Sequence, residues 1–254
     1  MENQQRALCK KVFLLHPHSV IRDDLLDSLI MAGFEIYTVL DEKRARKLLK
    51  KFPGSIMFVN IDEKLKEKEW EAYIRSIHED PEIIDCGLGI MSYNQDINLM
   101  QKYLMKINVS CGYVQLKQGV KESAKIILRT LEANEARSQR KCFRANCQDD
   151  ISATVNYKDD SGLYQGKIID INSKGIAAKF EKNSDLPLGP VLENMQVKLR
   201  TGLVKTDMTF FGKRPDNKQI NVLLFEPELS AENKLIIHRY IKQCLQKYID
   251  ELQV

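Results

Sequence analysis

The chain carries two different patterns of hydrophobic and polar positions, and the change between them falls near residue 136. In the first part, short apolar runs alternate with segments whose apolar residues recur every three or four positions, the spacing of one helical face. This pattern predicts five strands, each followed by a helix, with the strands in KVFLLHP, FEIYTVL, SIMFVNI, CGLGIMS and CGYVQLK. Parallel strands need crossover helices, and strands that are apolar throughout suit a sheet covered on both faces. The first part is therefore predicted to be an α/β unit built on a doubly wound parallel five-stranded sheet.

Capping residues predict where the first two helices begin and end. Ser19 is expected to be the N-cap of the first helix, with Asp23 and Asp24 in its positive first turn and Gly33 at its end. Asp41 is expected to begin the second helix, which should stop before Pro53.

The second part of the chain has the period of β-structure. The polar segment EANEARSQR is rich in helix formers and predicts a helical linker, which divides the chain into domains 1–136 and 137–254. Short alternating segments separated by turn residues then predict a six-stranded antiparallel β-barrel. The strands are expected in ISATVNY, LYQGKIIDI, IAAKFE, MQVKLRTG, VKTDMTFFG and QINVLLFEP, and an amphipathic helix from Ser230 is expected to close the barrel.

Composition and charge restrict the function classes. The net charge is only +4, and residues 1–138 and 139–254 contribute +1 and +3, so any anion site must be local. The start of the chain shows no apolar segment of a signal peptide, and no apolar run approaches the roughly 20 residues of a membrane span. These features predict a cytoplasmic protein without a membrane span.

Neither the cysteines nor the histidines suggest a metal or a cofactor. The six cysteines form no CxxC pair and have no histidine at zinc-ligand spacing, which indicates reduced thiols. His16 and His18 flank a proline after the first strand and are interpreted as loop residues. The cysteines are Cys9, Cys86, Cys111, Cys142, Cys147 and Cys244.

Two short motifs in the second part have the residue types of an anion site. The segment QRKCFR holds Arg140 and Arg144 four residues apart, and DINSKG follows with Asp170, Asn172 and Gly175. An RxxxR segment before the first barrel strand, a DxSxxG-like loop between the second and third strands, and a closing helix resemble the PilZ domain, the bacterial receptor for cyclic di-GMP. The resemblance covers residues 139–252. It departs from the commonest family pattern at Asn172, which stands where most members have serine, and the adjacent Ser173 is in the wrong register.

The chemistry of these five residues suits the ligand that the resemblance implies. Guanidinium groups chelate phosphate oxygens or the O6/N7 edge of guanine, and they stack on purines. Asp170 can accept from guanine N1–H and the exocyclic amine, and the amide of Asn172 can both accept and donate. Gly175 is expected to provide positive φ and close backbone approach. The expected ligand-binding set is Arg140, Arg144, Asp170, Asn172 and Gly175.

The order and length of the first part resemble the receiver domain of response regulators, over about residues 10–133. A receiver needs two acids after its first strand for Mg²⁺ and an aspartate at the end of its third to take a phosphoryl group. By this alignment His16 and Pro17 replace the acids and Asn60 replaces the acceptor. Mg²⁺ prefers carboxylate oxygens, and an amide cannot form an acyl phosphate. Ser92 and Lys117 do match the residues that read the phosphate. Because the acid pair and the acceptor aspartate are missing, the domain is interpreted as a receiver fold without the phosphotransfer chemistry.

Together these features predict a non-enzymatic, bacterial cyclic di-GMP effector, with no cofactor and no metal. Ligand binding would order the Arg140–Arg144 segment and change the domain arrangement, and thereby regulate a protein partner of unknown identity. One alternative is a PilZ-fold interaction module without a ligand, and another is a regulator phosphorylated on Asp62. A nucleic-acid-binding barrel would want aromatic residues interleaved with basic ones. Only Phe210-Phe211 with Lys213-Arg214 offers this, and a core strand ending in a charged turn explains that cluster, so no nucleic-acid partner is predicted.

Overall fold

The computed structural model describes residues 10–134, 136, 144–160, 162–181, 191–226 and 229–254. The chain forms two compact units, one made of Met1–Lys141 with Tyr248–Val254 and the other of Cys142–Lys247. The domain limits 1–136 and 137–254 stay a prediction. Most of the segment expected to be a helical linker lies outside the described residues.

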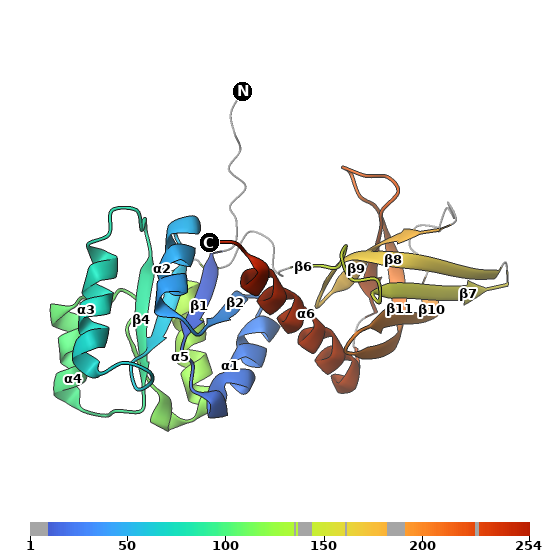
Figure 1. Ribbon diagram of the computed structural model, residues 1–254. Helices are drawn as coiled ribbons and strands as arrows, with labels where there is room; N and C mark the ends of the chain where they lie inside the picture. Colours follow the sequence, from blue (N-terminus) through green and yellow to red (C-terminus); the bar gives the residue numbers. More distant parts are fainter. Residues whose placement is uncertain (1–9, 135, 137–143, 161, 182–190, 227–228) are drawn as a thin grey trace. The chain divides into compact units, whose positions relative to one another are not determined.

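The first unit is a parallel five-stranded sheet with helices on both faces, as predicted (Figure 1). The strand order β2-β1-β3-β4-β5 is the doubly wound order that receiver domains share with flavodoxin. The strands are β1 (Lys11–Leu15), β2 (Glu35–Val39), β3 (Ile56–Asn60), β4 (Gly87–Ser92) and β5 (Tyr113–Gln115). The helices are α1 (Ser19–Met31), α2 (Glu42–Lys51), α3 (Glu67–His78), α4 (Ile97–Gln101), which continues as a π-helical turn over Lys102–Lys106, and α5 (Val120–Ala133).

The apolar faces that the periodicity predicts form the core of this unit. Leu25 and Leu29 of α1 pack in one cluster with Ile127 and Leu131 of α5 and with Phe58 of β3. All five side chains are fully buried. Removing this apolar surface from water is the main stabilising contribution to the unit.

The helix ends agree with prediction in part. Asp41 caps α2 by accepting a hydrogen bond from the backbone N–H of Arg44 at 2.6 Å. Gly33, with φ of +88°, follows the end of α1 as expected. The N-cap of α1 was predicted wrongly, because Ser19 is the first helical residue and the His18 ring accepts from the N–H of Val20 instead. The acidic residues expected in the first turn of α1 therefore lie beyond it.

The second unit is a closed six-stranded antiparallel barrel with a helix after it, as predicted. Its strands pair in the order β8-β7-β10-β11-β12-β9, and β9 pairs with β8 to close the barrel. The elements are β7 (Thr154–Asp159), β8 (Gly162–Asn172), β9 (Gly175–Phe180), β10 (Val191–Leu199), β11 (Gly202–Lys213), β12 (Asn221–Phe225) and α6 (Ala231–Glu251). A two-residue strand, β6 (Ala145–Asn146), pairs with β8 on the edge opposite β9.

The described side chains give no sign of a metal centre. No three His, Cys, Asp or Glu side chains come together as ligands anywhere in the described ranges. The described cysteines are free thiols, and burial raises the pKa of Cys86 and of Cys147 to about 12, which makes them poor nucleophiles near neutral pH. Within the same part of the chain, every helix is too short or too polar to span a bilayer.

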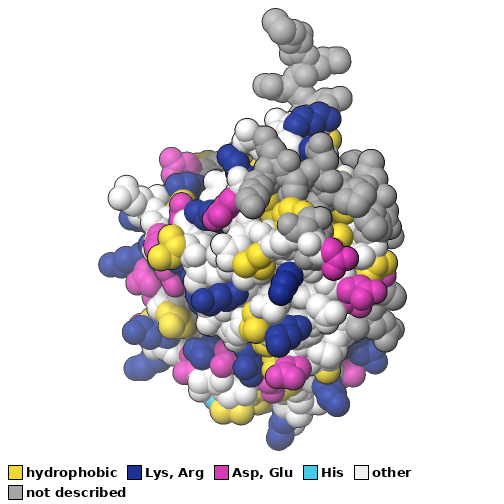
Figure 2. Space-filling model, turned by 90° about the vertical axis from the view of Figure 1, so that its right-hand side faces the viewer, with side chains coloured by type: hydrophobic (Ala, Val, Ile, Leu, Met, Phe, Trp, Pro, Cys, Tyr) yellow, Lys and Arg dark blue, Asp and Glu magenta, His cyan; other side chains and the backbone are white. Residues whose placement is uncertain are grey.

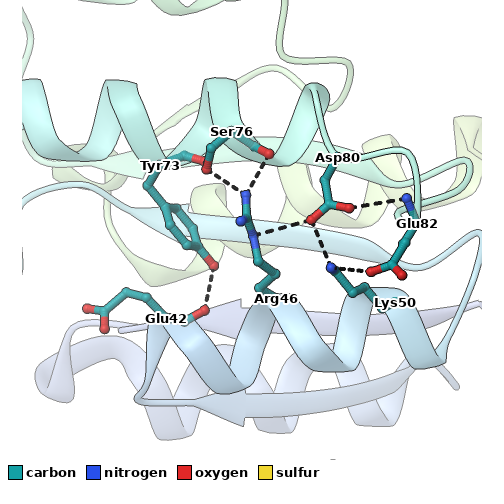
Figure 3. Close-up of polar contacts among 7 residues, drawn as sticks. All are labelled: Glu42, Arg46, Lys50, Tyr73, Ser76, Asp80 and Glu82. Carbon is teal, nitrogen blue, oxygen red and sulfur yellow. Dashed lines mark hydrogen bonds and ion pairs between the residues drawn. The ribbon is translucent and has the colours of Figure 1, made fainter.

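A polar network joins α2 to α3 and to the loop after α3 (Figure 3). Arg46 donates to the backbone oxygen of Ser76 at 2.5 Å and to its hydroxyl at 2.6 Å. Lys50 lies 3.0 Å from a carboxylate oxygen of Asp80 and 2.5 Å from one of Glu82. The basic face of α2 therefore fixes the end of α3.

We predict that Asp80→Asn destabilises the first unit in a pH-dependent way. The hydrogen bond from Lys50 lowers the pKa of Asp80 from its ordinary value of 3.8. A carboxyl whose pKa is lowered on folding stabilises the protein above the unfolded-state pKa, and this contribution is lost as the pH falls through the folded-state pKa. In urea unfolding, the variant should be less stable than wild type near neutral pH, and the difference should shrink below about pH 3.8. The control Glu79→Gln removes a neighbouring carboxylate that is not one of the partners of Lys50, and a similar profile for both variants would contradict the prediction.

Candidate functional site

The outer face of β8 presents Asp170 because the strand is irregular at this point. Ile168 pairs with Ala178 and Asp170 pairs with Ala177, so Ile169 is an extra residue between the two pairs. Such a β-bulge re-aims the side chains beside it, and bulges are frequent next to functional sites. Ile168 stays in the barrel core while the Asp170 side chain is 14% exposed.

The short strand β6 brings the second arginine of the RxxxR segment to this bulge. Ala145 pairs with Ile171, Asn146 pairs with Asp170, and the N–H of Cys147 donates to the oxygen of Ile169 at 2.9 Å. Arg144 directly precedes β6, and its Nη1 lies 3.9 Å from Oδ1 of Asp170. The two motifs, separated in the sequence, thus meet through one described residue from each. Arg140 lies outside the described residues.

A third basic residue at this position was not predicted. Arg214, in the turn after β11, donates from Nη2 to Oδ2 of Asp170 at 2.5 Å, and its Nε lies 3.9 Å from Asp216. From the sequence alone, Arg214 is interpreted as part of a charged turn. That turn is present, but the closure of the barrel brings it to β8. Asp170 therefore lies between two guanidinium groups.

Asn172 and Gly175 have structural roles in the β8–β9 turn. Oδ1 of Asn172 accepts from the N–H groups of Lys174 at 2.8 Å and of Gly175 at 2.9 Å. The carbonyl oxygen expected to accept from guanine is thus bonded within the turn, and Nδ2 is the group left to face a ligand. The positive φ expected for Gly175 is wrong, because this glycine does not have a left-handed backbone. It is needed for close approach, since a Cβ here would lie 2.2 Å from the backbone oxygen of Leu223 on β12.

Substitutions at Asn172 are predicted to follow from these turn contacts. Asn172→Ser should keep cyclic di-GMP binding, because a hydroxyl can also accept from the turn N–H groups. Asn172→Leu should lower both binding and barrel stability by roughly 1–3 kcal/mol, because it removes the acceptor of two turn N–H groups, one of them part-buried. Ser173→Ala is the control from the same turn and should bind like wild type, because the turn N–H groups donate to Oδ1 of Asn172 and not to the serine hydroxyl. Calorimetry on the three variants checks this, and loss of binding in Ser173→Ala alone would shift the motif by one residue.

The edge of the first unit that corresponds to a receiver acceptor site is filled by its own side chains. Asn60 is buried, and its Nδ2 donates to the backbone oxygen of His16 at 2.9 Å. The carboxylate of Asp62 accepts from the hydroxyl of Ser92 at 2.6 Å and from the N–H of Tyr93 at 2.5 Å. Both carboxylate oxygens of Asp62 are therefore engaged, which disfavours the alternative in which Asp62 accepts a phosphoryl group.

The remaining landmark residues at this edge form contacts of their own. Nζ of Lys117 lies 3.4 Å from the amide oxygen of Gln95. His16 contacts Glu42 at 2.8 Å through Nε2. Neither contact supplies the pair of acids that would hold Mg²⁺.

We predict that beryllofluoride or acetyl phosphate with Mg²⁺ produces no change in mass or in the fluorescence of Trp70. This is the single tryptophan of the chain, it is fully buried, and its Nε1–H donates to the backbone oxygen of Glu63, one residue after Asp62. It therefore reports on the loop that would move. Magnesium alone serves as the blank, and a saturable Mg²⁺-dependent response would disprove the prediction of a silent receiver.

Comparison with known proteins gives similar folds but no family match. No family model and no curated protein matches the chain. The PilZ domain of YcgR from Escherichia coli, solved with c-di-GMP, is 17% identical with a TM-score of 0.37, and the match covers 45% of this chain and 100% of that chain. MrkH of K. pneumonia in its apo state is 15% identical with a TM-score of 0.38, over 46% of this chain and 54% of that one. The signal receiver domain of an HD domain-containing protein from Pseudomonas fluorescens Pf-5 is 15% identical with a TM-score of 0.41, over 51% of this chain and 100% of that chain.

The topology of the two units is what carries the fold assignment. A sheet of order β2-β1-β3-β4-β5 is receiver-like, and a closed six-stranded barrel with a following helix is the architecture predicted for a PilZ domain. The predicted pairing of a receiver-like unit with a PilZ-like barrel is confirmed at the level of fold.

Proposed function

We propose that the barrel binds cyclic di-GMP on the outer face of β8 and that the protein is a non-enzymatic effector of this dinucleotide. The observation that carries the proposal is the pairing of β6 with β8, which sets Arg144 beside Asp170. The ligand-binding set is Arg140, Arg144, Asp170, Asn172 and Gly175. No catalytic step, cofactor or metal is assigned.

The chemistry of the site supports a guanine nucleotide in particular. A carboxylate accepts from N1–H and the exocyclic amine of guanine, a donor pair that adenine lacks on that edge. A guanidinium group can pair with phosphate oxygens or stack on the base. Because Arg144 is exposed and lies just before the two-residue strand β6, it can close over the ligand at little cost in packing.

The effector role follows from the location of the arginines. The RxxxR segment lies between the last helix of the first unit and the first long barrel strand. Ligand that binds both arginines orders this segment and changes the arrangement that a partner protein meets. The partner contacts the ligand-bound form in preference to the free form, and the chain acts in the cytoplasm.

Calorimetric titration of the full chain with cyclic di-GMP tests the proposal. Cyclic di-AMP is the control ligand, since it keeps both phosphates and the ring but changes the base edge that Asp170 would read. Saturable binding of cyclic di-GMP with much weaker binding of cyclic di-AMP is expected. Equal affinity for the two ligands would show that Asp170 does not recognise the guanine base. An absence of heat with both would leave the alternative, a barrel that serves as a protein-interaction module.

A further inference from the structure

Two lysines on the outer face of the barrel lie directly opposite each other. Lys167 of β8 pairs with Lys179 of β9 in the antiparallel ladder. Both are exposed, and their sequence neighbours Gly166, Ile168 and Ala178 are buried. The two lysine side chains therefore lie on the same outer face of the barrel. Directly opposed side chains in such a ladder have Cβ atoms roughly 4.5–5.5 Å apart.

This arrangement is electrostatically unfavourable without an anion. Like charges directly opposite each other destabilise a strand pair. Neither lysine forms an ion pair with any carboxylate that the structure describes. A third lysine lies in line with this pair across the sheet. Thr154 of β7 pairs with Lys167 on one side and with Lys198 of β10 on the other. Three cationic side chains thus cross four neighbouring strands.

The lysine pair lies next to the candidate site. Lys179 is two residues from Ala177, which pairs with Asp170. Because a strand rises about 3.3 Å per residue, the lysine pair is roughly 7 Å along the outer face from the bulge. A nucleotide whose base contacts Asp170 can reach this distance with its phosphate.

The chain as a whole carries little excess positive charge, with a net charge of +4. On the face drawn in Figure 2, basic, acidic and hydrophobic side chains are intermixed. A small site for one or two phosphates fits a chain of such low net charge better than a long polyanion track, since non-specific nucleic-acid binding depends on many phosphate contacts.

We propose that Lys167 and Lys179 form a phosphate site that holds a phosphate of the dinucleotide whose guanine lies at Asp170, with Lys198 extending the site. This assignment rests on the proposed function and adds to it a second group of ligand-binding residues on β8 and β9. The ammonium groups supply charge-assisted hydrogen bonds to phosphate oxygens, and the bound anion relieves the repulsion between the lysines.

Lysine acetylation followed by mass spectrometry tests the site in the full wild-type chain. Saturating cyclic di-GMP should strongly slow the acetylation of Lys167 and Lys179. Lys158 and Lys205 are exposed lysines of the same barrel and serve as internal references whose rates should not change. Unchanged rates at the lysine pair while the ligand is bound would overturn the proposal.

Matched double variants give the affinity. Lys167→Gln with Lys179→Gln should weaken cyclic di-GMP binding roughly 10- to 100-fold, the scale of one or two charged hydrogen bonds, and should reduce its salt dependence. Lys158→Gln with Lys205→Gln makes the same change in net charge and should have little effect. Equal losses in both variants would mean a long-range field without a specific site, and would also overturn the proposal.

Two further titrations separate this proposal from the proposed function. If wild type binds no cyclic di-GMP, the proposed function fails, and the dinucleotide is wrong as the source of the phosphate. Pyrophosphate protection of Lys167 and Lys179 would then retain a phosphate site, while absence of protection would eliminate it. A short DNA duplex that protects the pair better than the dinucleotide would assign the lysines to nucleic acid and contradict the assignment made here.

Discussion

Arg144→Ala is expected to weaken cyclic di-GMP binding by at least about 2 kcal/mol, roughly 30-fold, because one partner of a charge-assisted contact is removed. The variant should fold normally. Arg144 is exposed, and its closest approach to Asp170, 3.9 Å, is too long for a strong ion pair. The loss should therefore appear in calorimetry with almost no change in the thermal midpoint of the free protein.

Two further variants test whether the effect is specific to the guanidinium group of Arg144. Arg144→Lys keeps the charge but loses the planar fork, so it should bind less well than wild type and better than the alanine variant. Lys174→Ala removes an exposed basic residue from the nearby turn and should leave the affinity unchanged. Wild-type affinity in Arg144→Ala would show that the RxxxR segment is not part of a ligand site.

Gly175→Ala is expected to destabilise the barrel by about 2–3 kcal/mol, the upper range for overpacking a tightly packed position. The new Cβ would lie 2.2 Å from the backbone oxygen of Leu223 and 3.1 Å from Cα of Leu224. These are backbone atoms of a paired strand, so relief requires β9 and β12 to separate rather than one side chain to rotate. Because β9 also closes the barrel against β8, the strain acts on the closure itself.

Urea unfolding measures the effect of Gly175→Ala, with Lys174→Ala as the control from the same turn. The transition of the barrel should shift, while buried Trp70, which belongs to the first unit, should report an unchanged transition for that unit. A variant as stable as wild type would mean that β9 and β12 do not approach as closely as described.

Periodicity was sufficient to predict the order of elements in both units. It could not predict features that depend on how one element meets another. Ser19 has the composition of an N-cap, but the chain leaving β1 turns one residue earlier, so His18 takes that position. Such ends depend on backbone geometry that residue preference alone does not determine.

The candidate site illustrates the same limit. Asp170 and Asn172 could be selected from the sequence because both lie in one short motif. Arg214 could not, because its contact with Asp170 spans 44 residues and exists only when β9 closes the barrel between β8 and β12. Likewise, position 175 requires glycine because a Cβ would collide with the backbone of β12, and not because the residue has a positive φ.

The buried amide of Asn60 has a consequence for timing. An acyl phosphate stores a signal covalently, so the signal outlasts its donor until the bond is hydrolysed. The amide of Asn60, at the acceptor position, cannot form such a bond. If the barrel is the input, the memory of the protein is only as long as the residence time of a non-covalent ligand, and residence time is the quantity that most affinity changes alter. The output would then follow the concentration of the dinucleotide closely, falling as soon as the ligand is degraded.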